Sequence, residues 1–227
     1  MDGLTRYRER QRPPGGCAEL DDLERIALLR LVLSDGVGAA AIRRGIERVG
    51  SAQELVRQPT ALREAGARAA VSASQAEARR VLVQTVELGV RCVAWHEDDY
   101  PTGLLDLEHP PALLFVRGDL QALAEPCVAI VGSRRCTASG REVARDLARS
   151  LSRAGVVVVS GLALGIDGAA HQGALEGASP TVAVVAGSVE RPTPRSHAGL
   201  AQQILRQGGV LIAEHPPGTK VRPFQFP

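Results

Sequence analysis

The chain has 227 residues, of which 44% are hydrophobic and 23% charged, a composition typical of a folded globular protein with one or two domains. Its net charge is only +2, so a polyanion would have to be bound by a local patch rather than by the field of the whole protein. Aromatic residues make up 3%, too few for the aromatic-rich surface on which many single-strand-binding proteins stack bases.

The four cysteines, Cys17, Cys92, Cys127 and Cys136, are scattered without a CxxC pair or a histidine at zinc-ligand spacing. This pattern predicts neither a structural metal nor a disulfide framework. The first residues are polar, and no run of about 18 apolar residues occurs in the chain. We therefore expect a cytosolic protein without a membrane partner.

The N-terminal part of the chain predicts a tail followed by a helical domain. Residues 1–20 are polar and contain Pro-Pro-Gly-Gly, which predicts a flexible segment. Residues 21–89 show helical spacing of apolar side chains, and Gly36 and Gly38 predict a tight turn between two helices. Such turns present backbone N–H groups to DNA in helix-hairpin-helix modules, but they also serve as packing turns in small bundles. The sequence leaves both roles open.

From residue 90 to 227 the pattern predicts a second domain, in which short apolar runs alternate with helical segments. Two strands come first, and four more are expected at residues 128–131, 156–159, 181–186 and 210–213, with helices near 139–153, 167–177 and 197–207 between them. This order predicts a Rossmann-like, doubly wound α/β domain with a parallel sheet and helices on both faces. The run at 128–131 is typical of a buried central strand.

In such sheets ligands bind beyond the carboxyl ends of the strands, where this chain has polar and glycine-rich loops. The first loop, "GSRRCT", offers Gly132 for close backbone approach and Ser133 and Thr137 as hydroxyl donors. Its Arg134 supplies a planar fork suited to phosphate. The loop is neither GxGxxG nor a Walker loop, so we predict no nucleotide cofactor.

The next loops add further polar groups. In "SGLALGIDGAAHQGAL", Gly161 begins the strand-to-helix turn, Asp167 is expected to cap the helix, and His171 lies on the same helical face as Asp167. The Asp-His pair is either structural or an acid/base couple, and too few ligands accompany it to define a metal site. The third loop contributes Glu190, Arg195 and His197, and Glu214 ends the fourth strand, as the sequence shows.

The segments "VGSRRCTASG", "VVSGLALGIDGAAHQGAL", "PTPRSHAGL" and "GGVLIAEHPPG" resemble, in order and spacing, the DNA-processing protein A family, also called DprA or Smf. The resemblance covers residues 22–227. It departs from the family where Thr193 replaces a usual aromatic residue, and where Glu190 and His197 replace the usual Asp and Asn. The family also continues beyond the match to Phe226-Pro227, into the region that holds most of its self-association and RecA-contacting surfaces.

What the resemblance implies is a cytosolic, non-enzymatic protein that binds single-stranded DNA. Members protect incoming strands in natural transformation and help to load the recombinase RecA. The implied site is a basic pocket at the carboxyl edge of the sheet, with Arg134 as phosphate anchor and Arg195 as a second basic position. Ser133, Gly161 and His171 would shape that pocket, and the helical domain would be sterile-alpha-motif-like. Homodimer formation and RecA contact stay open, because the usual surfaces lie beyond residue 227.

Two alternatives remain on sequence grounds. One is a nucleotide-processing enzyme of phosphoribohydrolase type that uses Glu190 or Glu214 with Arg134, although the later PGGxGTxxE motif of those enzymes is missing. The other is a partial product of a DprA-like gene, in which a shortened sheet would expose an unpaired edge and an uncovered apolar face.

Overall fold

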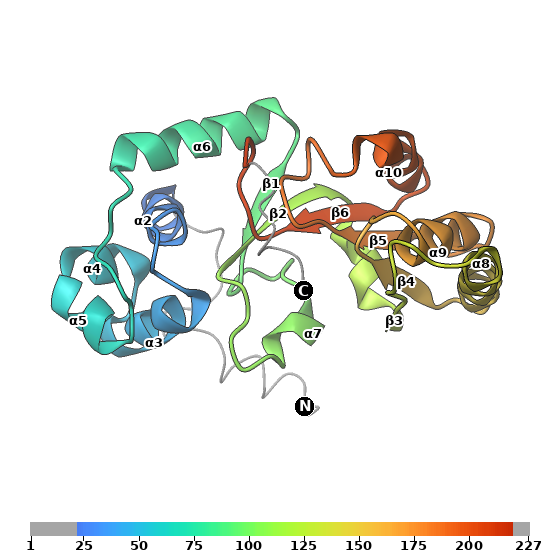
Figure 1. Cartoon of the computed structure of the whole chain (residues 1–227). Coiled ribbons are helices and arrows are strands. Elements are labelled where there is room, and N and C mark those ends of the chain that lie inside the picture. Colours follow the sequence, from blue (N-terminus) through green and yellow to red (C-terminus); the bar gives the residue numbers. More distant parts are fainter. Residues whose placement is uncertain (1–21, 220–227) are drawn as a thin grey trace. The chain divides into compact units, whose positions relative to one another are not determined.

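The computed structural model describes residues 22–219, which divide into two compact units (Figure 1). Unit 1 contains the residues up to Glu87 together with Cys92–Leu114, and unit 2 contains Leu88–Arg91 and the residues from Phe115 onward. The domain boundary that we predict between residues 89 and 90 differs from this division, since residues 92–114 group with the helices. The predicted tail, residues 1–20, lies outside the described residues.

An ion pair joins the segment after Cys92 to the first described helix of unit 1, α2 (Asp22–Val32). Arg25 Nη2 lies 2.7 Å from Glu97 Oε1, and Glu97 Oε2 accepts the backbone N–H of Ala94 at 2.7 Å. Arg25 also donates to the carbonyl oxygen of Cys92. Burial raises the pKa of the Cys92 thiol to about 12, so this cysteine is a neutral, unreactive part of the core.

The rest of unit 1 is mainly helical. Leu28, Leu29 and Leu31 of α2 are fully buried and form the centre of its core. The other helices in the described part of unit 1 are α3 (Ala39–Val49), α4 (Ala52–Arg57), α5 (Pro59–Glu64), α6 (Gln75–Glu87) and the short α7 (Thr102–Leu105). Apolar residues at helical spacing therefore produce the bundle that the sequence predicts.

The Gly36–Gly38 turn packs against another part of the bundle. Gly36 has φ 81°, and its carbonyl oxygen accepts the N–H of Arg68 at 2.8 Å. A Cβ atom at Gly36 would lie 3.1 Å from the Cβ of Ala69. These contacts favour the packing role of the turn over the DNA-contacting one, because the conformation of Gly36 is explained by its neighbours.

Within residues 22–219 the sheet has six strands in the order β1-β2-β6-β5-β4-β3. Strands β3, β4, β5 and β6 are parallel, with Val128 opposite Val158 and Val159 opposite Val182. Strand β2 runs antiparallel to β6, so the parallel sheet that we predict is a mixed one. The strands are β1 (Arg91–Ala94), β2 (Leu113–Gly118), β3 (Cys127–Ala129), β4 (Val157–Ser160), β5 (Thr181–Val184) and β6 (Val210–Ala213). The predicted α/β class is confirmed.

Three helices connect the parallel strands: α8 (Ala138–Arg153), α9 (Ile166–Leu175) and α10 (Ala198–Arg206). They lie together in unit 2 (Figure 1), and α9 packs against both α8 and α10. Because β3 to β6 are neighbours in chain order, right-handed crossovers place all three helices on one face of the sheet. The alternation of strands and helices in the sequence predicts helices on both faces of the sheet. The three helices α8, α9 and α10 instead cover one face.

Strand β3 is an edge strand in the described part of the chain, although the sequence predicts a buried central one. All three of its residues are exposed. Val131 and Val184 lie on the face opposite the helices and are 70% and 45% exposed. The reason is topological: β4 pairs with one side of β3, and no described strand pairs with the other.

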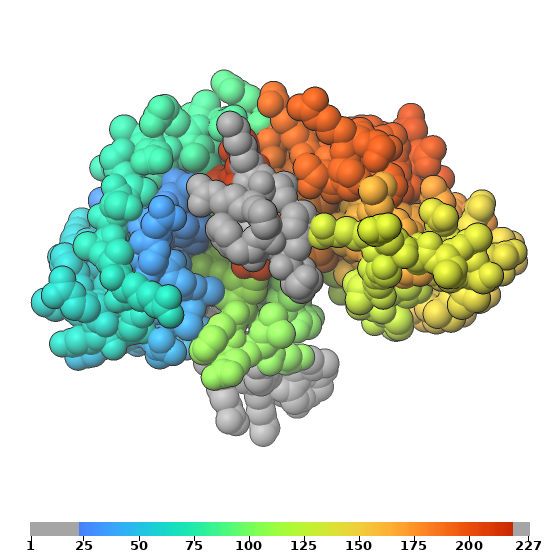
Figure 2. Space-filling view, in the orientation of Figure 1, coloured from blue at the N-terminus to red at the C-terminus, as the bar shows by residue number. Residues whose placement is uncertain are grey.

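Helices α8 and α9 approach closely because the side chains at their contact are small. Ala144 and Ala148 of α8 meet Ala170 and Ala174 of α9 in the buried cluster over Val158. Figure 2 shows the outer surface of α8 (yellow) at the margin of unit 2.

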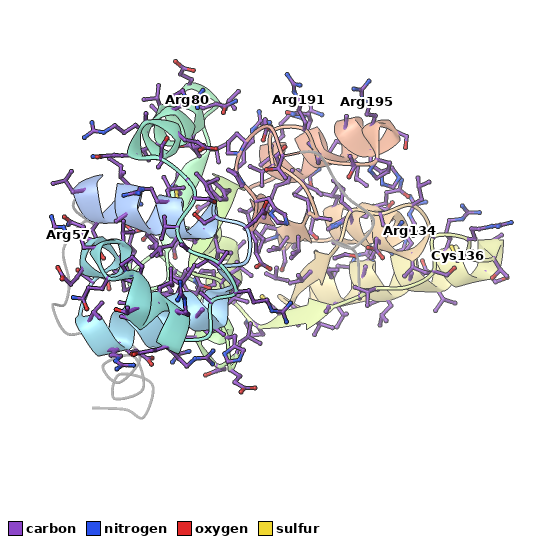
Figure 3. All side chains as sticks on the ribbon, turned by 60° about the vertical axis from the view of Figure 1, so that its left-hand side comes forward. Arg57, Arg80, Arg134, Cys136, Arg191 and Arg195 are labelled. Atoms are coloured by element: carbon purple, nitrogen blue, oxygen red, sulfur yellow. The ribbon has the colours of Figure 1, made fainter. Side chains whose placement is uncertain are left out.

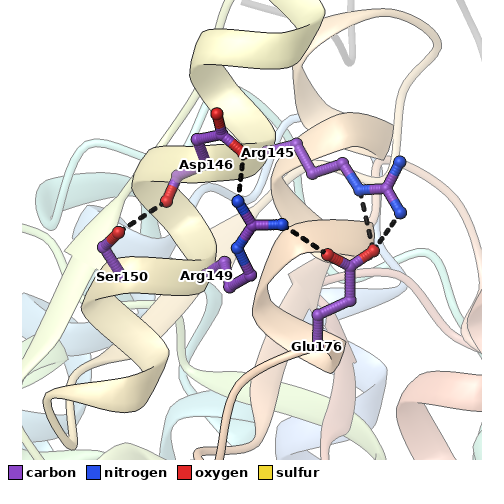
Figure 4. Close-up of polar contacts among 5 residues, drawn as sticks. All are labelled: Arg145, Asp146, Arg149, Ser150 and Glu176. Atoms are coloured by element: carbon purple, nitrogen blue, oxygen red, sulfur yellow. Dashed lines mark hydrogen bonds and ion pairs between the residues drawn. The ribbon is translucent and has the colours of Figure 1, made fainter.

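The rim of this contact is charged (Figure 4). Arg145 Nε donates to Glu176 Oε1 at 2.7 Å, and Arg149 donates to Glu176 Oε2 at 3.2 Å and to Asp146. The hydrogen bond from Arg145 is the main reason that the pKa of Glu176 is lowered.

We expect Gly173→Ala to destabilise the protein, because a Cβ there would lie 2.0 Å from the backbone oxygen of Arg145. Separating the two helices should cost about 2 kcal/mol of the free energy of unfolding. Gly199→Ala is the matched control, since a Cβ at Gly199 meets no atom within 4 Å. Urea denaturation followed by circular dichroism measures both variants, and equal stabilities would contradict this account of the interface.

Candidate nucleic-acid interface

The loop after β3 packs against the start of α9. A Cβ atom at Gly132 would lie 2.8 Å from Ile166 Cγ1, so only glycine fits there without a shift. The N–H of Ile166 donates to the carbonyl oxygen of Ser133 at 3.3 Å. Gly165 has φ 84°, and a Cβ on it would lie 2.2 Å from that same oxygen. The glycines of the two loops therefore allow their backbones to touch.

The hydroxyl groups of this loop have local partners. Thr137 is the N-cap of α8 and accepts the N–H of Gly140 at 3.0 Å, and Ser133 Oγ accepts the N–H of Arg135 at 3.1 Å. A hydroxyl that accepts one N–H keeps its own hydrogen to donate. Ser133 and Thr137 can thus order the loop and still donate to an anion at the start of α8, where the helix dipole favours negative charge.

The carboxylate of Asp167 joins the loops after β3 and β4. Its Oδ1 accepts the N–H of Gly132 at 3.3 Å, and its Oδ2 accepts the N–H of Gly161 at 3.1 Å. Asp167 is only 6% exposed. The sequence predicts Asp167 as the N-cap of α9, which is wrong, because Gly165 occupies that position. The buried carboxylate instead holds two loops that lie about 30 residues apart in the chain.

His197 joins the loop after β4 to the loop after β5. Its Nδ1 donates to the carbonyl oxygen of Leu162 at 2.8 Å. Leu162 is fully buried and has φ 59°, a left-handed conformation that is costly for leucine. A strained residue of this kind is typical of functional sites and persists only where its surroundings hold it.

Glu190 extends the same connections to the loop after β6. Its Oε1 accepts the hydroxyl of Ser188 and the N–H of Gly218, both at 2.8 Å. Its Oε2 is buried and has no hydrogen-bond partner among the described residues. Glu190 therefore serves to hold the loops together. Asp167, His197 and Glu190 connect the loops at the four strand ends. The sequence places all three in these loops but does not predict that they link one loop to another. The Gly-rich "SGLALGID" turn is the signal that could have suggested a close loop contact.

His171 lies inside the fold. It is fully buried, and its Nδ1 lies 2.9 Å from the hydroxyl oxygen of Thr181, which donates to the carbonyl of Val158 at 2.6 Å. Because the hydroxyl hydrogen is used in that bond, Nδ1 is the donor. Burial is the main cause that lowers the pKa of His171 to about 4. His171 can shape the site from below, but its ring does not reach the surface, and it is not paired with Asp167 as an acid/base couple.

Arg134 and Arg195 are exposed on two different loops of unit 2 (Figure 3). Arg195 begins a short 3-10 turn, η2 (Arg195–His197), and its side chain projects away from the ribbon. The backbone of Arg134 packs against Gly165, at the start of α9. Arg195 is linked to the same helix by His197, whose ring packs against Gly168. Of the seven predicted site residues, Gly132, Ser133, Arg134, Thr137 and Arg195 are exposed on the loops of unit 2 or at the start of α8. Gly161 is partly buried, and His171 is buried within α9.

Within residues 22–219 no group of three or more His, Cys, Asp or Glu side chains is arranged to hold a metal ion. No helix in the same range is long and apolar enough to cross a membrane.

Comparison with known proteins identifies the class to which this arrangement belongs. Residues 91–227 match the model of the DNA recombination-mediator protein A family. The chain is 37% identical over 149 residues to the DNA processing protein DprA of Bacillus subtilis and 40% identical over 128 residues to the protein Smf of Escherichia coli. These matches cover 65% and 56% of the chain. The chain belongs to the DprA/Smf family.

Two solved structures are also similar. DprA from Streptococcus pneumoniae superposes with a TM-score of 0.68 at 27% identity, over 91% of this chain and 72% of that one. DprA from Helicobacter pylori, studied for its single-stranded DNA binding mode, gives a TM-score of 0.50 at 29% identity over 60% of each chain. The matches to B. subtilis DprA and E. coli Smf span 50% and 34% of those relatives' length.

Burial of neutral His171 makes stability depend on pH. The ordinary pKa of histidine, 6.5, applies to the unfolded chain, and the folded value is about 4. Between these values the unfolded state binds the extra proton, so the free energy of unfolding falls as the pH is lowered, by about 2 kcal/mol from pH 7 to pH 5. His171→Asn keeps a donor near the position of Nδ1 but does not titrate.

Urea denaturation of both proteins at pH 7 and pH 5 tests this expectation. The asparagine variant should be less stable at pH 7 but should lose about 2 kcal/mol less than the parent on acidification. Equal losses in the two proteins would show that His171 is not the group responsible.

Proposed function

We propose that unit 2 binds the sugar–phosphate backbone of single-stranded DNA at the carboxyl ends of its parallel strands. The observation that carries this proposal is that hydrogen bonds of Asp167 and His197 connect the loops after β3, β4 and β5. The first of these loops bears Arg134 and the third bears Arg195. In this proposal each guanidinium grips a phosphate, and Ser133, Thr137 and the N–H groups at the start of α8 add donors. Gly132, Gly161 and His171 give the site its shape.

The local charge supports a polyanionic ligand. Residues 132–141 and 187–197 together contain five arginines and one carboxylate, in a chain whose net charge is only +2. The carboxylate is Glu190, which is bonded to Ser188 and Gly218. Few aromatic side chains are present to stack bases, so backbone contacts would dominate and sequence preference would be small.

The likeness to DprA proteins supports a wider role. In this proposal the protein acts in the cytoplasm without catalysis, protects incoming single strands during DNA uptake, and assists the loading of RecA. This wider role is that of whole proteins of the family, and the chain spans 50% of B. subtilis DprA and 34% of E. coli Smf. The H. pylori relative, whose single-stranded DNA binding mode has been studied, supports the choice of ligand.

Replacing Arg134 by alanine should weaken binding to oligonucleotides of any sequence. One lost phosphate contact should make the slope of log K against log salt less steep by about 0.7, because fewer counterions are released. Fluorescence anisotropy with labelled dT20 and a mixed 20-mer, over a series of salt concentrations, measures both effects.

Arg153→Ala is the matched control for charge. Arg153 is exposed at the last position of α8, about 22 Å along the helix from the loop that bears Arg134. It should retain the parent's slope. If Arg134→Ala binds like the parent at every salt concentration, the proposed site is wrong.

A further inference from the structure

His197 holds two parts of the candidate site at once. Its ring donates from Nδ1 to the carbonyl oxygen of Leu162, at 2.8 Å. Its backbone N–H donates to the carbonyl of Pro194 at 2.9 Å, which closes the turn that carries Arg195. One residue therefore links the turn that carries Arg195 to the loop after β4.

The contact fits closely on both sides. A Cβ at Gly168 would lie 2.5 Å from His197 Cε1, so the ring lies directly against the first turn of α9. Leu162 is fully buried at φ 59°, and a carbonyl held by a ring N–H is one means by which such a backbone is kept in place.

The same segment continues to Arg134. Three residues after Leu162, Gly165 packs on the carbonyl of Ser133, and Ile166 donates its N–H to that carbonyl at 3.3 Å. The path from Arg195 to Arg134 thus consists of one hydrogen bond from His197, a loop of four residues that begins at the buried Leu162, and a direct backbone contact.

We propose that His197 is a positioning residue of the DNA site, which fixes Arg195 relative to Arg134 so that both can bind phosphates of one strand. This inference rests on the proposed function. In this proposal His197 acts through the protein, because its Nδ1 donor is used for the bond to Leu162. Holding two binding groups at a fixed spacing raises the local concentration of the second group once the first is bound.

Two substitutions separate the hydrogen bond from the bulk of the ring. His197→Phe fills the same space but has no donor for the Leu162 carbonyl. His197→Asn places an amide N–H close to the position of ring Nδ1 and can restore the bond. The Phe variant should bind dT20 about fivefold more weakly than the parent, and the Asn variant should stay within about twofold of it.

The decisive measurement is the effect of Arg195→Ala in each background. In the parent and in the Asn variant, this substitution should weaken dT20 binding by about tenfold, and in the Phe variant by only about twofold, because Arg195 is no longer held in place. A merely structural role for His197 would lower the melting temperature without changing the effect of Arg195→Ala. An equal loss in all three backgrounds would overturn the inference.

Gly168→Ala provides an independent test if the Phe variant does not fold. Its added methyl group must displace the ring of His197 while leaving every hydrogen-bonding group in the chain, so it should reproduce the reduced effect of Arg195→Ala. An unreduced effect in that variant would also overturn the inference. Loss of binding in Arg134→Ala, measured in parallel, tests the proposed function separately: if that variant binds normally, the site itself is wrong rather than the role of His197.

Discussion

The carboxylate of Asp167 is the interaction on which the site depends. It accepts one N–H from the loop after β3 and one from the loop after β4, at 3.3 and 3.1 Å. Burying a carboxylate costs free energy that hydrogen-bond donors offset, and a backbone N–H shielded from water needs an acceptor. Each side therefore satisfies the other, and the two loops hold a fixed distance without a ligand. His197 and Glu190 extend this principle to the loops after β5 and β6.

Glycines make these contacts sterically feasible. Side chains at Gly132, Gly161 or Gly165 would come within 2.8 Å of Ile166, Asp167 or Ser133. The backbones of these loops therefore pack directly on one another and are joined by side-chain hydrogen bonds. Arg134 and Arg195 are exposed on the same loops. Such an arrangement suits binding to a flexible polymer, because the entropy of ordering the site has been lost on folding and need not be lost again on binding.

The two arginine-bearing loops differ in how they are supported. Arg134 follows a loop that is held directly by α9, whereas Arg195 depends on a single ring, that of His197. The helical unit contributes stability of its own through Leu28, Leu29 and Leu31, and its glycine turn is occupied by the contact with Arg68 and Ala69. The proposal of DNA binding therefore rests on the basic loops of unit 2.

The sequence by itself determined most of the elements and predicted where a site would lie. Short apolar runs and helical spacing predict the strands and helices, and the rule that loops at carboxyl strand ends bind ligands identifies Arg134 and Arg195, because these signals are local. Only the tertiary structure decided that β3 is an exposed edge, that β2 is antiparallel, and that His171 is neutral and buried. It also decided the partners of Asp167 and His197, since those contacts join residues up to 35 positions apart, which no local pattern records.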